Sequence, residues 1–264
     1  MAHTFINGID LCYHIYGSGP PLILVHGLGF DHSAWGPQIP AFSRDYQVIV
    51  YDVRGHGRSE APDQPYSIEL FADDLHFLLR FLGLRNSCLL GLSMGGRIIL
   101  HFALKYGAEA KALILADAQS ETPPASQERF RMLARMAREQ GMVETAEVFF
   151  SLPFMENLAI FNPEAYRREK AAFQTRSPVG FAQACLAIAE MKPLTDRLGE
   201  IQSPTLALAG EKDEAYLPYL EIYARRIPRC RKAILPRAGH VSNLENPEAF
   251  NEAVLDFLGG LQTP

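Results

Sequence analysis

The stretch SCLLGLSMGGR, residues 87–97, decides the fold of this 264-residue chain. Its first half is an apolar run, typical of a strand buried on both faces of a sheet, and its second half opens a helical pattern that continues to Tyr106. Between the two, residues 91–95 match the pattern G-x-S-x-G. A serine at such a sharp strand-to-helix turn adopts a strained conformation, and glycines beside it avoid collisions with adjacent elements. The stretch therefore predicts Ser93 as a nucleophile displayed at the end of a strand.

Strand-like and helical segments alternate on both sides of this turn. Five further apolar runs are expected to form buried strands: 21–25, 46–50, 112–116, 204–209 and 231–235. Helices are expected at 67–82 and 247–258, and an antiparallel hairpin at the N-terminus around Asn7-Gly8. This alternation predicts an α/β fold with a mostly parallel, twisted sheet and helices on both of its faces.

One long segment breaks the alternation. From Glu121 to Asp196 the chain is rich in helix-forming residues, and its prolines divide it into about four short helices. We expect a helical cap at 121–196, inserted into a core made of 1–120 and 197–264. Aromatic and Met residues of this cap are candidates for an apolar pocket lining: Phe130, Met132, Phe149, Phe150, Phe154 and Phe173.

A serine nucleophile needs a base, and the base needs an acid to orient it. On a fold of this kind the acid and then the histidine follow the serine along the chain. Asp213 lies just beyond the expected strand 204–209, and His240 lies in a short loop after the last strand. Glu211 is the rival acid, two residues before Asp213. The sequence predicts a Ser93-His240-Asp213 triad.

The turn His26-Gly27-Leu28-Gly29 follows the first long strand. Its glycines allow the backbone to approach a bound carbonyl group, so the Leu28 amide is a natural donor to a developing oxyanion. The Met94 amide, at the start of the helix after Ser93, is the expected second donor. Gly27 is a candidate contact for the substrate, and His26 is expected to hold the turn by hydrogen bonds.

Together these motifs resemble the α/β-hydrolase superfamily: the strand followed by HGxG, the D-x-R-G-x-G-x-S stretch at 52–59, G-x-S-x-G, G-x-x-D at 210–213 and the late G-H at 239–240. The resemblance covers about 4–119 and 197–258. It implies Ser93 as nucleophile, His240 as base, Asp213 as its orienter, and the Leu28 and Met94 amides as oxyanion hole. The core is most similar to small carboxylesterases and 3-oxoadipate enol-lactonases, while superfamily members with an Asp nucleophile do not match Ser93. Cofactor-free haloperoxidases share the same triad.

Arg97 suggests an alternative. The run S-x-G-G-R is similar to that of the pyruvate-releasing lyase of the MenH type, which acts on an anionic substrate, although Leu92 stands where those enzymes usually have Tyr. Arg97 lies one helical turn beyond Ser93, on nearly the same face, so it can bind a carboxylate or pair with an acid across the cap boundary. The interpretation favoured here is a structural Arg97, with Phe130 and Phe154 among the substrate contacts. A receptor-like binding protein on the same fold is the non-enzymatic alternative.

The composition excludes several other classes of protein function and location. The net charge is -5, and Lys and Arg are scattered among acids, so the sequence has no basic patch of the kind that binds nucleic acid. No apolar stretch reaches the ~18 residues of a membrane span, and the N-terminus lacks the pattern of a signal peptide. The cysteines lie far apart, which favours buried thiols over disulfides or a metal site. We expect a cytoplasmic enzyme for a small-molecule ester with small to medium acyl chains, without cofactor or metal. The oligomeric state stays open.

Overall fold

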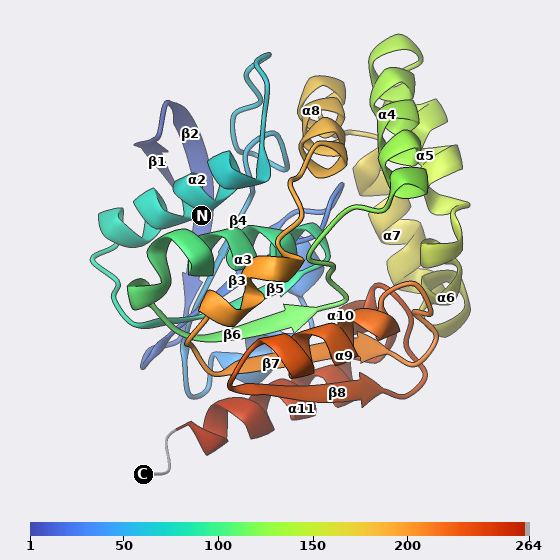
Figure 1. Ribbon diagram of the computed structural model, residues 1–264. Coiled ribbons are helices and arrows are strands. Elements are labelled where there is room, and N and C mark those ends of the chain that lie inside the picture. The colour runs from blue at the N-terminus through green and yellow to red at the C-terminus, as the bar shows by residue number, and fades with distance from the viewer. Residues whose placement is uncertain (262–264) are drawn as a thin grey trace.

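The computed structural model describes residues 1–261, which contain one eight-stranded sheet in the order β1-β2-β4-β3-β5-β6-β7-β8 (Figure 1). Its strands have these bounds: β1 Ala2–Ile6, β2 Ile9–Tyr16, β3 Pro21–Val25, β4 Gln47–Tyr51, β5 Ser87–Leu92, β6 Ala110–Ala116, β7 Thr205–Gly210 and β8 Cys230–Leu235. Strands β1 and β2 run antiparallel to their neighbours, and all other pairs are parallel. The predicted α/β fold with a mostly parallel sheet is confirmed.

The expected N-terminal hairpin is also present. Ile6 pairs with Ile9 across a turn in which Asn7 and Gly8 both have positive φ, as a tight two-residue hairpin requires. The central strands β3, β5 and β6 carry almost fully buried aliphatic side chains, so an unbroken apolar run is the composition that this position needs.

Helices cover both faces of the sheet (Figure 1). On one face lie α2 Ile68–Phe81, α3 Met94–Tyr106 and α9 Leu217–Arg226, while α1 Ile39–Phe42 and α11 Pro247–Gly260 pack together on the other. Ser67 caps α2 by accepting from the Leu70 amide, as the sequence indicates. Shorter helical segments fill the connections: η1 His32–Trp35, η2 Gly107–Glu109, η3 Thr195–Glu200 and α10 Ser242–Glu245.

Between β6 and β7 the chain forms five helices, here named the insertion: α4 Pro124–Glu139, α5 Met142–Phe150, α6 Pro153–Phe161, α7 Pro163–Phe173 and α8 Pro178–Ala189. The sequence predicts about four helices here, and the structure has five. Prolines begin α6, α7 and α8, but the break between α4 and α5 is at Gly141, whose φ of +91° is outside the helical region. The proline pattern therefore missed it.

The insertion packs on the core around the turn after β3. Phe149 stacks on Phe173 at 4.8 Å between ring centroids, and Phe181 meets Phe173 edge-on at 4.9 Å. A Cβ on Gly29 would lie 2.5 Å from the Phe173 ring, so this turn fits directly against the aromatic cluster. An ion pair between Arg176 and Asp31, at 2.5 Å, adds a second connection. The insertion and the turn are thus tightly joined.

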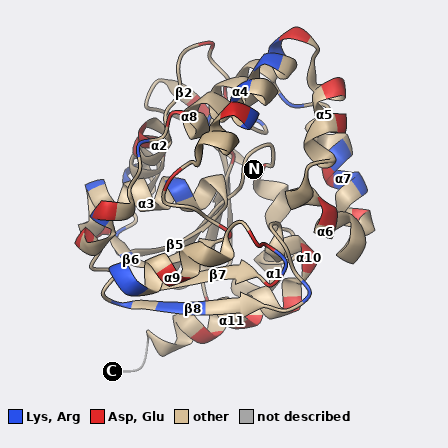
Figure 2. Cartoon of the chain, turned by 45° about the vertical axis from the view of Figure 1, so that its right-hand side comes forward, with Lys and Arg blue, Asp and Glu red and all other residues tan. Residues whose placement is uncertain are grey.

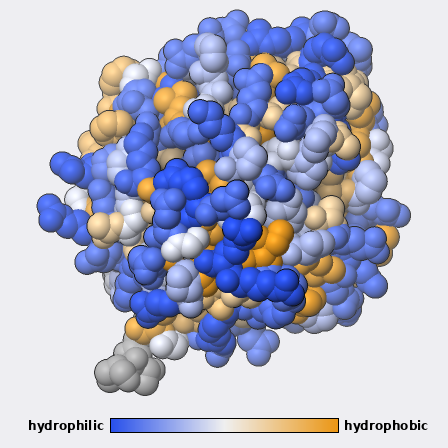
Figure 3. All heavy atoms as spheres, viewed as in Figure 1, coloured by the Kyte–Doolittle hydropathy of each residue, from blue (hydrophilic) through white to orange (hydrophobic). Residues whose placement is uncertain are grey.

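The outer surface mixes both signs of charge. Figure 2 shows Lys and Arg interspersed with Asp and Glu along the outer helices α4 and α7, while α5 carries only acidic residues. Apolar residues on the face seen in Figure 3 occur in small patches between hydrophilic ones. Within residues 1–261, none of the helices combines the length and apolar composition needed to cross a membrane.

Candidate active site

Ser93 follows β5 at a sharp turn into α3. Its φ of +54° and ψ of -110° are a strained conformation for a residue with a side chain. A Cβ on Gly95 would lie 2.7 Å from the Val25 carbonyl carbon, and one on Gly91 would lie 2.6 Å from the Gly96 nitrogen. The two glycines are therefore required by close backbone packing, as the sequence predicts, and the Ser93 hydroxyl points away from the sheet.

The structure brings Ser93, His240 and Asp213 together. His240 Nε2 lies 2.9 Å from Ser93 Oγ, and His240 Nδ1 lies 2.9 Å from Asp213 Oδ2. Asp213 and His240 are only 5% and 7% exposed, respectively. Because β5, β7 and β8 are parallel, the loops at their carboxyl ends meet at one edge of the sheet. This chain of two hydrogen bonds has the connectivity of a nucleophile, a base and an orienting acid.

Glu211 occupies a different position from Asp213. Its Oε1 accepts from the Arg237 amide at 3.1 Å on the exposed side of the turn. The Lys212 amide, next along, donates to the Ala238 carbonyl at 2.9 Å. Glu211 thus helps to join the turn after β7 to the loop after β8, and Asp213 is the acid that contacts the histidine.

The turn after β3 lies beside Ser93. The Cβ position of Gly27 is 3.5 Å from Ser93 Cβ, which places the adjacent Leu28 at the same site. Met94 is the first residue of α3, where an amide has no intrahelical acceptor. His26 Nε2 accepts from the Val53 amide at 3.0 Å, and its Nδ1 lies 2.8 Å from the Gly27 carbonyl oxygen. The expected role of His26 in holding this turn is confirmed, and its burial lowers the pKa of its ring.

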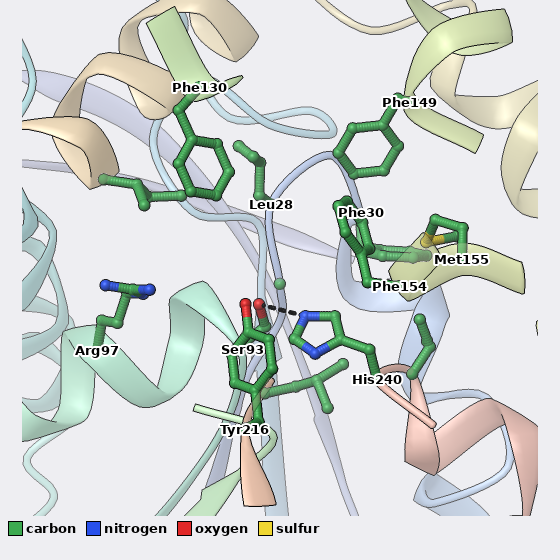
Figure 4. A pocket seen from close by; sticks show the side chains of 14 residues that line it. Leu28, Phe30, Ser93, Arg97, Phe130, Phe149, Phe154, Met155, Tyr216 and His240 are labelled. Carbon is green, nitrogen blue, oxygen red and sulfur yellow. Dashed lines mark hydrogen bonds between the residues drawn. The ribbon is translucent and has the colours of Figure 1, made fainter. Parts of the chain in front are cut away.

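A pocket opens above Ser93 (Figure 4). The insertion supplies most of its apolar wall: Phe130, Phe149, Phe154, Met155 and Ile188. Its polar side chains are Ser93, Arg97, Tyr216 and His240. Gly27 and Leu28 also line it. The core residues that the sequence predicts at the site therefore border one cavity, with two exceptions. Asp213 lies behind His240, and Met94 lies beneath Ser93. Of the other cap candidates, Phe150 and Phe173 are buried in the aromatic cluster instead.

Arg97 borders the pocket on the side away from His240 (Figure 4). The residue is 2% exposed, and its guanidinium donates to the Thr122 hydroxyl at 2.7 Å, the Gln119 side-chain oxygen at 2.9 Å and the Glu121 backbone carbonyl at 3.2 Å. The Met191 thioether sulfur, at 3.4 Å, is a fourth acceptor, and all four acceptors are neutral. No carboxylate within residues 1–261 forms an ion pair with Arg97. Of the two alternatives for Arg97, pairing with an acid across the cap boundary is therefore not observed.

Sequence reasoning missed Tyr216. Its ring centroid lies 4.2 Å from that of His240, and the Phe154 ring contacts the same imidazole at 5.4 Å. Burial raises the pKa of the Tyr216 hydroxyl to about 12, although the nearby Arg97 charge lowers it, so the phenol is neutral in the pocket. Its position three residues after Asp213, on the turn at a strand end, is the one local signal in the sequence. A wider surface cleft shares Phe130, Phe154, Tyr216 and His240 with the pocket and gives it an entrance.

In the described part of the chain, one group of side chains has the spacing of a metal site: Asp31, His32 and Asp52. Their oxygens already have partners. Asp31 pairs with Arg176, and Asp52 accepts from the His32 and Arg58 amides. This group therefore serves as an internal network of ion pairs and hydrogen bonds.

Comparisons with known proteins agree with this geometry. The sequence profile of the Alpha/beta hydrolase family matches residues 22–253. The 3-oxoadipate enol-lactonase 2 of Acinetobacter baylyi is 31% identical over 249 residues, covering 93% of this chain and 92% of that protein. A thermophilic esterase from Thermogutta terrifontis, solved with malate bound, has a TM-score of 0.91 at 34% identity, covering 99% of this chain and 97% of that one. An enol-lactonase from Burkholderia xenovorans LB400 has a TM-score of 0.91 at 31% identity, covering 98% and 100%.

Proposed function

Because the chain belongs to the alpha/beta hydrolase family, we propose that it is a serine hydrolase that cleaves carboxylic esters of small to medium acyl chains. The observation that carries the proposal is the pair of 2.9 Å contacts that join Ser93 Oγ, His240 and Asp213 at the pocket floor. The esterase and enol-lactonase relatives support the same class of reaction. The intact nucleophile and base also argue against a purely receptor-like role.

In this mechanism Ser93 Oγ attacks the carbonyl carbon of the ester while His240 Nε2 takes the hydroxyl proton. Asp213 holds the imidazole by its Nδ1–H and stabilises the imidazolium that forms. The alcohol leaves with the proton from Nε2, which gives an acyl-serine. Water, deprotonated by the same nitrogen, then releases the carboxylic acid and restores Ser93.

The Leu28 and Met94 amides would hold the oxyanion of each tetrahedral intermediate. The turn at Gly27 lies against Ser93, and Met94 is at the N-terminal end of α3, so both donors can face the same oxygen. Loss of one such donor typically costs about 3 to 4 kcal/mol of transition-state stabilisation. The aromatic wall of the insertion would take the acyl chain, since it is the apolar side of the cavity.

The proposal is tested by covalent labelling and turnover. An organophosphate should give one adduct by intact-mass spectrometry, located on the peptide that contains Ser93. A Ser93→Ala variant should lose both the adduct and the hydrolysis of a chain-length series of p-nitrophenyl esters. Full labelling of that variant would contradict the assignment of the nucleophile.

A second candidate function is hydrolysis or lyase chemistry on an anionic substrate, such as an enol-lactone that carries a carboxylate. The specific observation in its favour is Arg97, a buried cation in the pocket whose four acceptors are all neutral. A substrate carboxylate would supply the counter-charge through charge-assisted hydrogen bonds. The Thermogutta terrifontis esterase, solved with the dicarboxylate malate bound, is a relative in which this possibility can be compared.

Matched neutral and carboxylate-bearing esters separate the two candidates. For a structural Arg97, the neutral ester has the higher kcat/KM, and Arg97→Ala affects both substrates alike. For an anionic substrate, the charged ester is favoured by more than about tenfold, Arg97→Ala removes that preference, and Arg97→Lys retains part of it.

Three further expectations stay proposals: a cytoplasmic location, a core of residues 1–120 and 197–264, and a cap of 121–196. Limited proteolysis tests the domain limits, since cleavage between the units should fall near residues 120 and 196.

A further inference from the structure

Glu245, the last residue of α10, contacts the loop that carries His240. Its Oε2 accepts from the Gly239 amide, and its Oε1 accepts from the Val241 amide at 3.3 Å. These two residues are the immediate chain neighbours of His240. A single carboxylate, 6% exposed, therefore fixes the backbone on both sides of the imidazole.

A second buried acid holds the same region from below. Asp117 follows β6, and its Oδ1 accepts from the Gly210 amide at 3.0 Å while its Oδ2 accepts from the Ser242 hydroxyl. Gly210 begins the turn to Asp213, and Ser242 lies two residues after His240. Asp117 thus joins the two turns to each other, whereas Glu245 holds only the backbone that flanks His240.

We propose that Glu245 is a positioning residue for the reaction, which keeps His240 Nε2 within hydrogen-bond distance of Ser93 by holding the amides on both sides of it. The proposal rests on the proposed function of Ser93 and His240. Glu245 does not line the pocket, so it would act through His240 rather than on the substrate. A displacement of about 1 Å in a catalytic group can cost roughly 100-fold in rate, so the position of this loop matters directly.

The chemistry of the contact requires a carboxylate. Two amide donors need two acceptor oxygens, which an ionised Glu provides, whereas a Gln side chain turns an N–H toward one of them. A protonated Glu is a weaker acceptor for both amides, because it has lost the negative charge that strengthens these hydrogen bonds. The hold on His240 is therefore complete only when Glu245 is ionised.

Glu245 changes its ionisation state near neutral pH. Burial raises the pKa of Glu245 to about 7; the Gly239 and Val241 amides and the His240 charge lower it, and the Asp213 charge raises it. Asp117 is the other acid that acts on this cluster, and burial together with the Asp213 charge raises its pKa well above the ordinary value. As pH falls through about 7, protonation of Glu245 should weaken this hold and lower the activity of the wild type.

The test compares Glu245→Gln with Glu252→Gln, a matched control at an exposed position on α11. At pH 8 Glu245→Gln should lower kcat for a p-nitrophenyl ester by roughly tenfold or more, with KM changed less than about twofold. The ratio of wild-type to Glu245→Gln kcat/KM should be largest at pH 8 and should shrink toward about one as pH falls below 7, because only the wild type has a carboxyl group to protonate there. The control should match the wild type in every respect.

Wild-type kcat and an unchanged acid limb in Glu245→Gln would overturn the proposal. If this variant does not fold, the wild-type profile decides alone, because a kcat/KM that stays level as pH falls through about 7 leaves no role for ionised Glu245. Ser93→Ala, measured in the same assay, keeps the two proposals apart. Persistent activity in Ser93→Ala contradicts the proposed function, whereas inactivity there with a normal Glu245→Gln contradicts only the role of Glu245.

Discussion

The contact between Gly55 and Gly180 gives a direct test of how the insertion is seated. Gly180 lies in the first turn of α8, and Gly55 lies in the loop after β4. A Cβ on Gly180 would lie 2.6 Å from the Gly55 Cα and closer still to its carbonyl oxygen. Both sides of this contact are backbone, so neither can move aside as a flexible side chain would.

Gly180→Ala should therefore displace α8. Ordinary contact begins at 3.4 Å, so the helix has to move by at least about 0.8 Å. Overpacking of this kind costs about 1 to 3 kcal/mol, which a gain in helix propensity of up to about 1 kcal/mol partly offsets. For a domain of this size we expect the Tm to fall by roughly 2 to 8 °C. The kcat/KM for apolar esters should fall as well, because α8 supplies Ile188 to the pocket.

Gly107→Ala is the matched control. The added methyl group meets nothing within 4 Å, and Gly107 has an ordinary helical φ of -53°. This substitution should be neutral or stabilise the fold by up to about 1 kcal/mol. Thermal unfolding of the three proteins, followed by circular dichroism, measures the difference. Gly180→Ala unfolding at or above the wild-type temperature would refute the close backbone contact.

Three other outcomes are expected. Asp213→Asn should lower kcat by up to about 10⁴-fold and Glu211→Gln by far less; the reverse ranking would make Glu211 the acid. Burial alone would raise the pKa of Asp31. The Arg176 charge and the Ser33 donors outweigh burial, so the pKa of Asp31 lies below its usual range. Arg176→Met should therefore cost about 3 to 5 kcal/mol in urea unfolding at pH 7, and this loss should shrink as pH falls below about 4. Thiol titration at pH 8 should detect at most Cys230, the half-buried cysteine, in the folded protein. After denaturation it should detect all four cysteines: Cys12, Cys88, Cys185 and Cys230.

The groups that sequence predicts well are those specified by short local patterns. Ser93 is identified by a strand, a glycine turn and a helix within eleven residues, and Asp213 and His240 by their places after two strands. Each strand end carries its residue to the same edge of the sheet, so a local prediction was enough to place the residues together. Tyr216, in contrast, enters the pocket because the turn after Asp213 directs its ring onto His240, and no pattern of spacing specifies that direction.

Glu245 and Gly141 show two other limits of sequence reasoning. In the sequence, Glu245 is an ordinary acid near the start of a helix. Only the fold of the His240 loop brings the Gly239 and Val241 amides to its carboxylate. Gly141 ends α4 through a backbone conformation that side-chain composition does not reveal, whereas the neighbouring breaks are marked by proline. Both cases depend on backbone geometry rather than on residue type.

Arg97 shows why helical spacing alone does not identify the partner of a side chain. The helical spacing correctly places it beside Ser93, and the segment after β6 does supply its acceptors, as expected for the cap boundary. Glu121 lies in that segment, yet its backbone carbonyl contacts Arg97 while its carboxylate accepts from the Thr195 hydroxyl. The acid is at the expected place in the chain, but its charge is turned elsewhere. The pocket therefore has an apolar wall from the insertion and, on the core side, a buried cation that forms no ion pair with a carboxylate among residues 1–261.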